Sequence, residues 1–169
     1  MQQPIPEWRF VPMTEPHGRD ICTWRYPEPY AVFNWSPWDE LAEGPSEFAD
    51  PLLREEQFES VLNADGALCG FAQFFPIAGW TRLGLGLRPD LCGQGLGPSF
   101  TRAIVGRALQ RSPLNKIDLE VMTSNSRAIR TYLKAGFVLS DTYVRATPTV
   151  PAEFHCMVYE GDSPPGMIY

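Results

Sequence analysis

Residues 83–100 read LGLGLRPDLCGQGLGPSF, and residues 119–137 read LEVMTSNSRAIRTYLKAGF. The first stretch predicts a strand that passes through a tight glycine turn into the start of a helix. The second predicts a strand that ends near an asparagine, followed by a short helix that Gly136 closes. The two stretches are separated by the length of one helix, and this order and spacing indicates an α/β domain more strongly than either stretch alone.

The flanking sequence predicts further strands and helices around a central mixed sheet. Asp65-Gly66 is a strong hairpin signal, and Pro51 favours the first turn of a short helix. Residues 26–51 mix prolines, aromatic residues and acids, which indicates irregular structure with one helical turn near residues 38–41. Strands are expected at residues 8–13, 58–62, 67–75, 80–87, 117–122, 138–146 and 154–160, and helices at residues 20–26 (capped by Asp20), 51–58, 98–111 and 126–135.

Length and composition are those of an ordinary globular domain. The chain has 169 residues, of which 44% are hydrophobic and 20% charged. No apolar run reaches the roughly 18 residues that cross a bilayer, and the first residues lack the features of a signal peptide. Four cysteines without CxxC spacing and two histidines predict no metal site, and a net charge of -6 argues against nucleic acid. We expect one cytoplasmic domain over residues 1–169, with no membrane partner.

The glycine loop at residues 93–97 follows a strand and opens a helix, an arrangement suited to an anion. Glycines let a ligand approach the backbone, and the helix N-terminus adds unpaired N–H donors. A P-loop needs Lys and then Ser or Thr after its last glycine, where this chain has Pro98 and Ser99. A dinucleotide fingerprint needs G-x-G-x-x-G, where this chain has G-x-G-x-G. A turn that only packs the helix on the sheet is the structural alternative.

In both stretches the chain resembles the GCN5-related N-acetyltransferase (GNAT) family. The acetyl-CoA loop of that family reads Gln/Arg-x-x-Gly-x-Gly/Ala, and a later segment reads Asn-x-x-Ala-x-x-x-Tyr-x-x-x-Gly-Phe. The later pattern is matched at every position, by Asn125, Ala128, Tyr132, Gly136 and Phe137. The segment looks most like that of ribosomal-protein alanine acetyltransferases. The resemblance covers residues 83–137, about a third of the chain.

The resemblance implies a fold, a cofactor and a set of binding residues. The fold is a mixed, mostly antiparallel sheet of roughly six to seven strands, splayed at the acetyl-CoA site and flanked by about four helices. A backbone N–H near Leu87 is expected to polarise the thioester carbonyl. The family often dimerises, so a homodimer is an expectation. The implied contacts to acetyl-CoA come from Leu85, Gly86, Leu87, Gly93, Gln94, Gly95, Leu96, Gly97, Pro98 and Asn125.

The first loop position departs from the family pattern. Cys92 stands where the family has Gln or Arg, and Pro98 removes one backbone N–H from the end of the loop. We expect the amides of residues 93–97 to hold the pyrophosphate with fewer side-chain contacts and a weaker affinity. The sequence places no histidine beside Cys92, so a bystander role is favoured over a nucleophilic thiol.

Glu120 and Tyr132 are the candidate catalytic residues. Glu120 lies in a strand expected to be covered on both faces, where a charge is costly unless it is paired or protonated. The resemblance implies that Glu120 takes the proton of the amine, directly or through water, and that Tyr132 protonates the departing thiolate. Asp118 is the next candidate base. Two alternatives stay open: Glu120 only pairs with an arginine of the next helix, or Tyr132 is a core aromatic residue.

The acceptor is an amine by resemblance, and the segment of about residues 20–58 is expected to border its pocket. Residues 39–59 hold eight acids and one base, Arg54. The acids either steer cationic amines to the pocket or form a solvated face. Six aromatic residues between positions 24 and 38 either wall the pocket or fill a core. Peptide N-termini, polyamines, aminoglycosides and small amines all stay open.

We therefore expect an acetyl-CoA-dependent N-acetyltransferase in which a primary amine attacks the thioester directly in a ternary complex. The alternative from another class is a non-catalytic acyl-CoA-binding or sensing module on the same fold. An ATP or NAD enzyme is disfavoured, because no metal-binding or ribose-binding residue follows the glycine loop at the right distance.

Overall fold

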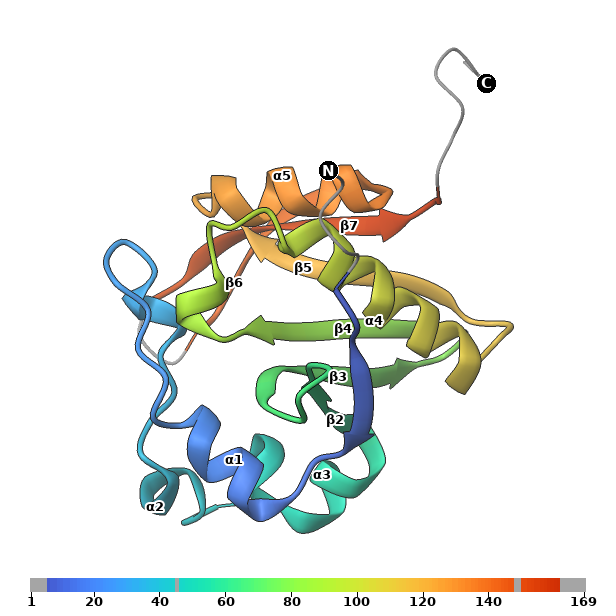
Figure 1. The fold of residues 1–169 in the computed structure, drawn as a ribbon. Coiled ribbons are helices and arrows are strands. Elements are labelled where there is room, and N and C mark those ends of the chain that lie inside the picture. The colour runs from blue at the N-terminus through green and yellow to red at the C-terminus, as the bar shows by residue number, and fades with distance from the viewer. Residues whose placement is uncertain (1–5, 45, 148–149, 162–169) are drawn as a thin grey trace. The chain divides into compact units, whose positions relative to one another are not determined.

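Seven strands form a mixed sheet in the computed structural model of the chain, which describes residues 6–44, 46–147 and 150–161. The strands are β1 (Arg9–Pro12), β2 (Phe58–Leu62), β3 (Leu68–Ile77), β4 (Trp80–Leu87), β5 (Lys116–Met122), β6 (Phe137–Arg145) and β7 (Ala152–Tyr159). They follow the order β1-β2-β3-β4-β5-β7-β6 (Figure 1). β4 and β5 run parallel, whereas β1–β2, β2–β3, β5–β7 and β6–β7 are antiparallel. The predicted mixed, mostly antiparallel sheet is confirmed.

The chain divides into two compact units. The first holds Met1–Phe74 and Gly84–Leu96, and the second holds Phe75–Leu83 and Gly97–Tyr169. The expectation of one domain over residues 1–169 stays a prediction. In the described residues, no helix combines the length and apolar character that a membrane span needs.

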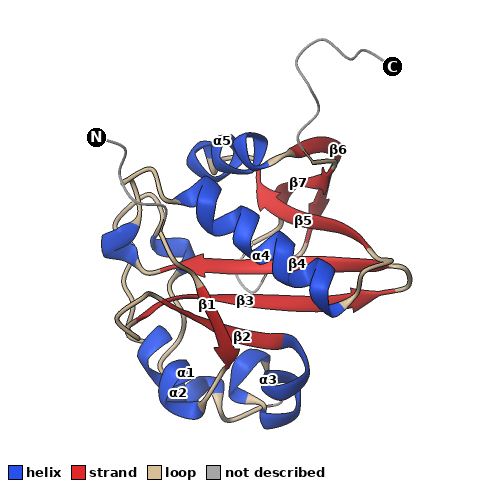
Figure 2. Cartoon of the chain, turned by 45° about the vertical axis from the view of Figure 1, so that its right-hand side comes forward, coloured by secondary structure: helices blue, strands red, loops and turns tan. Residues whose placement is uncertain are grey.

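The first unit carries three short α-helices, α1 (Glu15–Ile21), α2 (Trp38–Leu41) and α3 (Pro51–Gln57), which lie close together in Figure 2. Its core centres on the fully buried Phe48, whose ring contacts the rings of Trp35, Phe58 and Phe71 at centroid distances of 4.8, 5.7 and 6.1 Å. Trp24 is also buried in this cluster. Part of the aromatic segment at positions 24–38 therefore fills a core.

The first helix lies earlier than the sequence predicts. We expected residues 20–26 with Asp20 as the cap, whereas α1 spans Glu15–Ile21 and takes Thr14 as its cap. Thr14 Oγ1 accepts from the backbone N–H of His17 at 3.3 Å, and His17 Nδ1 accepts from the backbone N–H of Thr14 at 3.2 Å. This reciprocal capping box satisfies two helix donors at once, and it outweighs a single aspartate cap.

The second unit is built on α4 (Gly97–Arg111) and α5 (Ser126–Ala135). α4 buries Phe100, Ile104 and Val105. α5 begins at its cap Asn125, whose side-chain oxygen accepts from the backbone N–H of Ala128 at 3.2 Å. The helix ends at Gly136, which takes a left-handed φ of 107°. Both predicted helices are confirmed here, and α5 has the predicted bounds.

Candidate active site

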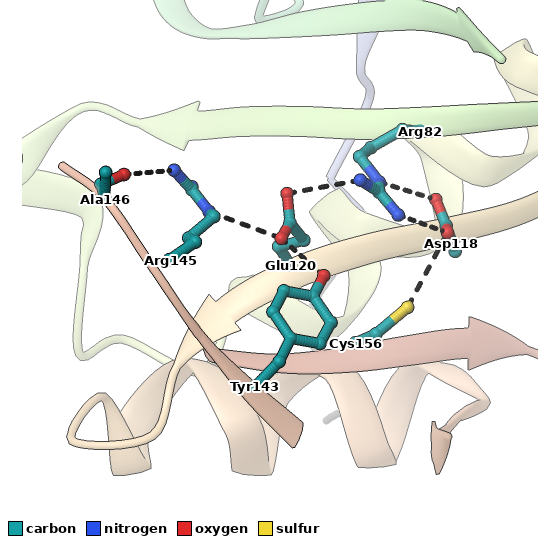
Figure 3. A network of polar contacts seen from close by, with 7 residues as sticks. All are labelled: Arg82, Asp118, Glu120, Tyr143, Arg145, Ala146 and Cys156. Atoms are coloured by element: carbon teal, nitrogen blue, oxygen red, sulfur yellow. Dashed lines mark hydrogen bonds and ion pairs between the residues drawn. The ribbon is translucent and has the colours of Figure 1, made fainter. Parts of the chain in front are cut away.

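Glu120 is the centre of a polar network that joins β4, β5 and β6 (Figure 3). Its Oε1 accepts from Arg82 Nη1 at 3.3 Å, and its Oε2 lies 3.3 Å from Arg145 Nε. The hydroxyl of Tyr143 donates a short hydrogen bond to the same Oε2. The Glu120 side chain is only 16% exposed. A carboxylate that is this buried requires paired charges, and the two guanidinium groups of Arg82 and Arg145 balance its charge.

Asp118 lies two residues earlier on β5 and is held by the same arginine. Asp118 and Arg82 are register partners in the parallel pair β4–β5. The guanidinium binds both carboxylate oxygens, at 3.1 Å from Nε and 2.9 Å from Nη2. The thiol of Cys156 on β7 lies 3.6 Å from Oδ2. This two-point contact fixes Asp118 more firmly than Glu120, because planar guanidinium and carboxylate groups match in geometry.

The network shifts the pKa values of the groups around the two carboxylates. The hydrogen bond to Asp118 raises the pKa of the Arg82 guanidinium. Burial, and then the hydrogen bond to Glu120, raise the pKa of the Tyr143 phenol. Burial, followed by the charge of Asp118, raises the pKa of the Cys156 thiol. All three groups thus keep their protons at neutral pH.

Tyr132 is half-buried on α5, with its ring centroid 6.0 Å from that of Phe137. Burial raises the pKa of the Tyr132 phenol to about 12. Within the described residues, the structure records no hydrogen bond to its hydroxyl and none between Tyr132 and Glu120. The phenol that reaches Glu120 is instead that of Tyr143.

The glycine loop adopts the backbone that only glycine takes without strain. Gly93 and Gly95 have φ angles of 76° and 78°, and apart from their chain neighbours no atom of the described residues lies within 4 Å of where their Cβ atoms would stand. Gln94 Nε2 donates to the carbonyl of Asp90 at 2.7 Å. Cys92 Sγ lies 3.7 Å from the carbonyl oxygens of both Leu87 and Arg88. Its bystander role stays a prediction.

Two other glycines of the motif are explained by packing. A Cβ on Gly97, the first residue of α4, would stand 2.9 Å from Cγ2 of Thr131 on α5. A Cβ on Gly86 would collide with the ring of Phe71. Both positions need glycine whether or not a ligand is present.

Asn125 has a structural role at the start of α5, and its predicted contact to acetyl-CoA stays a prediction. Its Oδ1 caps α5, and within the described part of the chain the structure records no partner for its Nδ2. The amide nitrogen is thus available to a ligand without loss of the cap.

The sequence missed Tyr143, Arg145 and Arg82 as partners of Glu120. Tyr143 and Arg145 lie two residues apart in a predicted strand, and this spacing places both side chains on one face. That alternation was a usable signal. The pairing of β6 with β7 and of β7 with β5 was needed to bring this face to Glu120.

The first unit also has an open pocket of about 420 Å³. Its lining residues are Arg19, Cys22, Thr23, Arg25, Pro37 and Trp38. Arg19 lies 5.2 Å from the ring centroid of Trp38. The pocket belongs to the segment expected to border the acceptor, but basic rather than acidic side chains line it. Within the described residues, no group of three or more His, Cys, Asp or Glu could hold a metal ion.

Comparison with known proteins shows a family match and a shared fold. A sequence model of the acetyltransferase (GNAT) family matches residues 19–137. No curated protein is significantly similar to the chain in sequence.

Several solved structures share the fold at low sequence identity. A spermidine N-acetyltransferase chimera from Vibrio cholerae and hSSAT is 18% identical, with a TM-score of 0.71 over 90% of this chain and 94% of that one. The Vibrio cholerae spermidine N-acetyltransferase in complex with CoA and spermine has a TM-score of 0.65 at 18% identity, over 89% and 94% of the two chains. The ribosomal-protein-S18-alanine N-acetyltransferase from Escherichia coli has a TM-score of 0.61 at 16% identity, over 96% and 100%.

Proposed function

The chain belongs to the acetyltransferase (GNAT) family, and we propose that it transfers an acetyl group to a primary amine by direct attack in a ternary complex. Acetyl-CoA is the acetyl donor of an N-acetyltransferase of this family. The observation that carries the proposal is the glycine loop, in which Gly93 and Gly95 are left-handed just before the start of α4. Its open backbone and the helix N-terminus fit a pyrophosphate. The proposed contacts are those of residues 85–87 and 93–98 and of Asn125.

Tyr132 is the proposed acid. Its raised pKa keeps the phenol protonated throughout the physiological range, and its hydroxyl is not committed to another described residue. In the proposed reaction the amine nitrogen bonds to the acetyl carbon, the C–S bond breaks, and Tyr132 supplies the proton that the thiolate takes up.

Glu120 is the proposed base, acting directly or through water, and Asp118 is the alternative. The carboxylate is engaged by three donors, and we propose that a cationic amine replaces one of them. Arg145 is the more exposed of the two arginines, at 46% against 30% for Arg82, whereas Arg82 is also held by two hydrogen bonds to Asp118. The substrate ammonium therefore takes the place of Arg145 in our proposal.

The acceptor class follows from the same exchange. A guanidinium on Glu120 supports a cationic acceptor, either an amine-bearing small molecule or a peptide N-terminus. Two of the similar enzymes act on such groups by name, one of them a spermidine N-acetyltransferase with spermine bound and the other a ribosomal-protein-S18-alanine N-acetyltransferase. A homodimer and a cytoplasmic location remain parts of the proposal, and four free cysteines support the latter.

A second candidate function has one observation in its favour. Glu120 is neutralised by two guanidinium groups and a phenol, as in a structural ion-pair network. A non-catalytic acyl-CoA-binding module would retain the glycine loop and use Glu120 only to join the strands.

Release of coenzyme A thiol from acetyl-CoA separates the two functions. The purified protein is incubated with acetyl-CoA and with spermidine, spermine, an aminoglycoside or a peptide with N-terminal alanine, and a reaction without amine is the control. The proposal predicts amine-dependent thiol release together with an acetylated amine in the mass spectrum. Binding of acetyl-CoA without release for any amine in the panel would favour the binding module.

A further inference from the structure

A short loop of the first unit, residues 26–34, is closed on itself by hydrogen bonds. The side-chain oxygen of Asn34 accepts from the backbone N–H of Tyr26 at 2.7 Å. Inside the loop, the backbone N–H of Tyr30 donates to Pro27 at 2.8 Å, and that of Asn34 donates to Ala31 at 3.0 Å. These bonds fix the position of Tyr26 relative to the rest of the loop.

The side chain of Tyr26 reaches the end of β4, 61 residues away in the sequence. Its hydroxyl donates to the backbone carbonyl of Leu87 at 2.7 Å, in a partly buried position. The same peptide group is held at its other end, where the N–H of Arg88 donates to the carbonyl of Cys69 on β3 at 2.8 Å. The peptide between Leu87 and Arg88 is thus fixed from two sides.

The direction of these bonds shows which edge of β4 Tyr26 occupies. In an extended strand, the N–H and C=O of one residue point to the same edge, and those of the next residue point to the opposite edge. Because the N–H of Arg88 points to β3, both backbone groups of Leu87 point to the edge away from β3. The Tyr26 hydroxyl therefore lies at the edge to which the N–H of Leu87 also points.

We infer that Tyr26 is a positioning residue for acetyl transfer. By holding the carbonyl of Leu87, it sets the backbone of that residue so that the Leu87 N–H is aimed at the thioester carbonyl. This inference rests on the proposed function and on the role that the family resemblance implies for the backbone N–H near Leu87, which is to polarise the thioester carbonyl. A fixed donor costs no reorganisation when the charge develops, and loss of one such donor lowers kcat by about 10²–10³-fold in enzymes of this kind of chemistry.

The change Tyr26→Phe tests the inference, because it removes the hydroxyl and keeps the ring. Without the hydroxyl, the Leu87 N–H is misaligned but not lost. We therefore predict a fall in kcat of about tenfold and an unchanged melting temperature. It also predicts a binding effect that needs no turnover. If the Leu87 N–H meets the acetyl carbonyl, the wild type binds acetyl-CoA more tightly than coenzyme A, and Tyr26→Phe loses that preference. Tyr159→Phe, which removes a phenol hydroxyl from β7, is the matched control and leaves both readouts unchanged.

The outcomes separate this inference from the proposed function. A Tyr26→Phe protein with wild-type kcat and unchanged preference for acetyl-CoA over coenzyme A overturns the role of Tyr26. An equal loss of affinity for both ligands with a lowered melting temperature also overturns it, because that result describes a purely structural tyrosine. A wild type that binds acetyl-CoA in preference to coenzyme A but acetylates no amine defeats the proposed function alone.

Discussion

The proposed role of Tyr132 as the general acid can be tested with a single substitution. Its phenol has a pKa raised by burial to about 12, and no described residue competes for its proton. We predict that Tyr132→Phe lowers kcat by about 10²-fold, the lower end of the usual contribution of a general acid. The dissociation constant of acetyl-CoA, measured by calorimetry, should change less than about threefold, because the ring is retained. That limit corresponds to about 0.6 kcal/mol in binding free energy. An unchanged kcat would remove Tyr132 from the reaction.

Glu120 differs, because its charge supports the fold as well as the proposed chemistry. We predict that Glu120→Gln lowers the free energy of unfolding by roughly 1–3 kcal/mol, because Arg82 and Arg145 lose their shared carboxylate. Urea denaturation measures this loss, and Glu153→Gln, an exposed change on β7, is the control.

The same variant tests the base. If Glu120 takes the proton of the amine, the rise of rate with pH flattens in Glu120→Gln. A variant that is less stable but keeps the wild-type pH profile would assign Glu120 to structure and move the base to Asp118 or to water.

At the scale of elements, the sequence predicts what local chemistry decides. α5 has its expected bounds because Asn125 and Gly136 set its two ends within the segment itself. The start of the first helix was predicted too late, because Asp20 and Thr14 are both good caps. The reciprocal hydrogen bonds between Thr14 and His17 decide between them. The ion pairs of Glu120 could not be predicted, because Arg82 reaches it from 38 residues away and Tyr143 from 23, and strand order alone brings them together.

The capping box of α1 makes the stability of the first unit sensitive to pH. Burial lowers the pKa of His17 from 6.5, against the opposing charge of Asp20. The unfolded chain therefore takes up a proton at a higher pH than the folded one. The stability that neutral His17 contributes is full above about pH 6.5, and it declines as pH falls below 6.5 until it is lost at the lowered pKa of the folded protein.

We predict that His17→Gln removes this part of the acid sensitivity. Gln at the same position can complete a capping box and does not titrate. Unfolding free energies at pH 8 should be similar for the two proteins, and the wild type should lose more stability than the variant between pH 7 and pH 5. Parallel declines would contradict the role of His17.

The contact between α4 and α5 gives a second test at this scale. Gly97→Ala places a methyl group 2.9 Å from Cγ2 and 3.0 Å from Oγ1 of Thr131. We predict a loss of about 1–3 kcal/mol in unfolding free energy from this overpacking. The double variant Gly97→Ala with Thr131→Ala removes both clashing atoms and should recover most of the loss.

Single Thr131→Ala is the matched control for that pair. If Gly97→Ala leaves stability unchanged but weakens acetyl-CoA binding, the glycine serves the ligand rather than the helix contact.

For the whole molecule, the net charge and the charge that lines the open pocket of the first unit have opposite signs. We expect the net charge of -6 and the acids of residues 39–59 to steer cationic amines to the site, and a solvated face is the alternative role of these acids. The open pocket of the first unit is lined by Arg19 and Arg25 instead. The charge of the molecule thus affects how an acceptor approaches. The amine screen is needed to identify the acceptor.

The proposed acetyl transfer depends first on the binding of acetyl-CoA as the donor. Calorimetric titration of the purified protein with acetyl-CoA, and separately with ATP and NAD, tests it directly. We expect micromolar binding of acetyl-CoA and no measurable binding of ATP or NAD, because the loop of residues 93–97 lacks the partners that a nucleotide site needs. Absence of acetyl-CoA binding would contradict the proposed acetyl transfer, and would mean that Cys92 and Pro98 have disabled the loop.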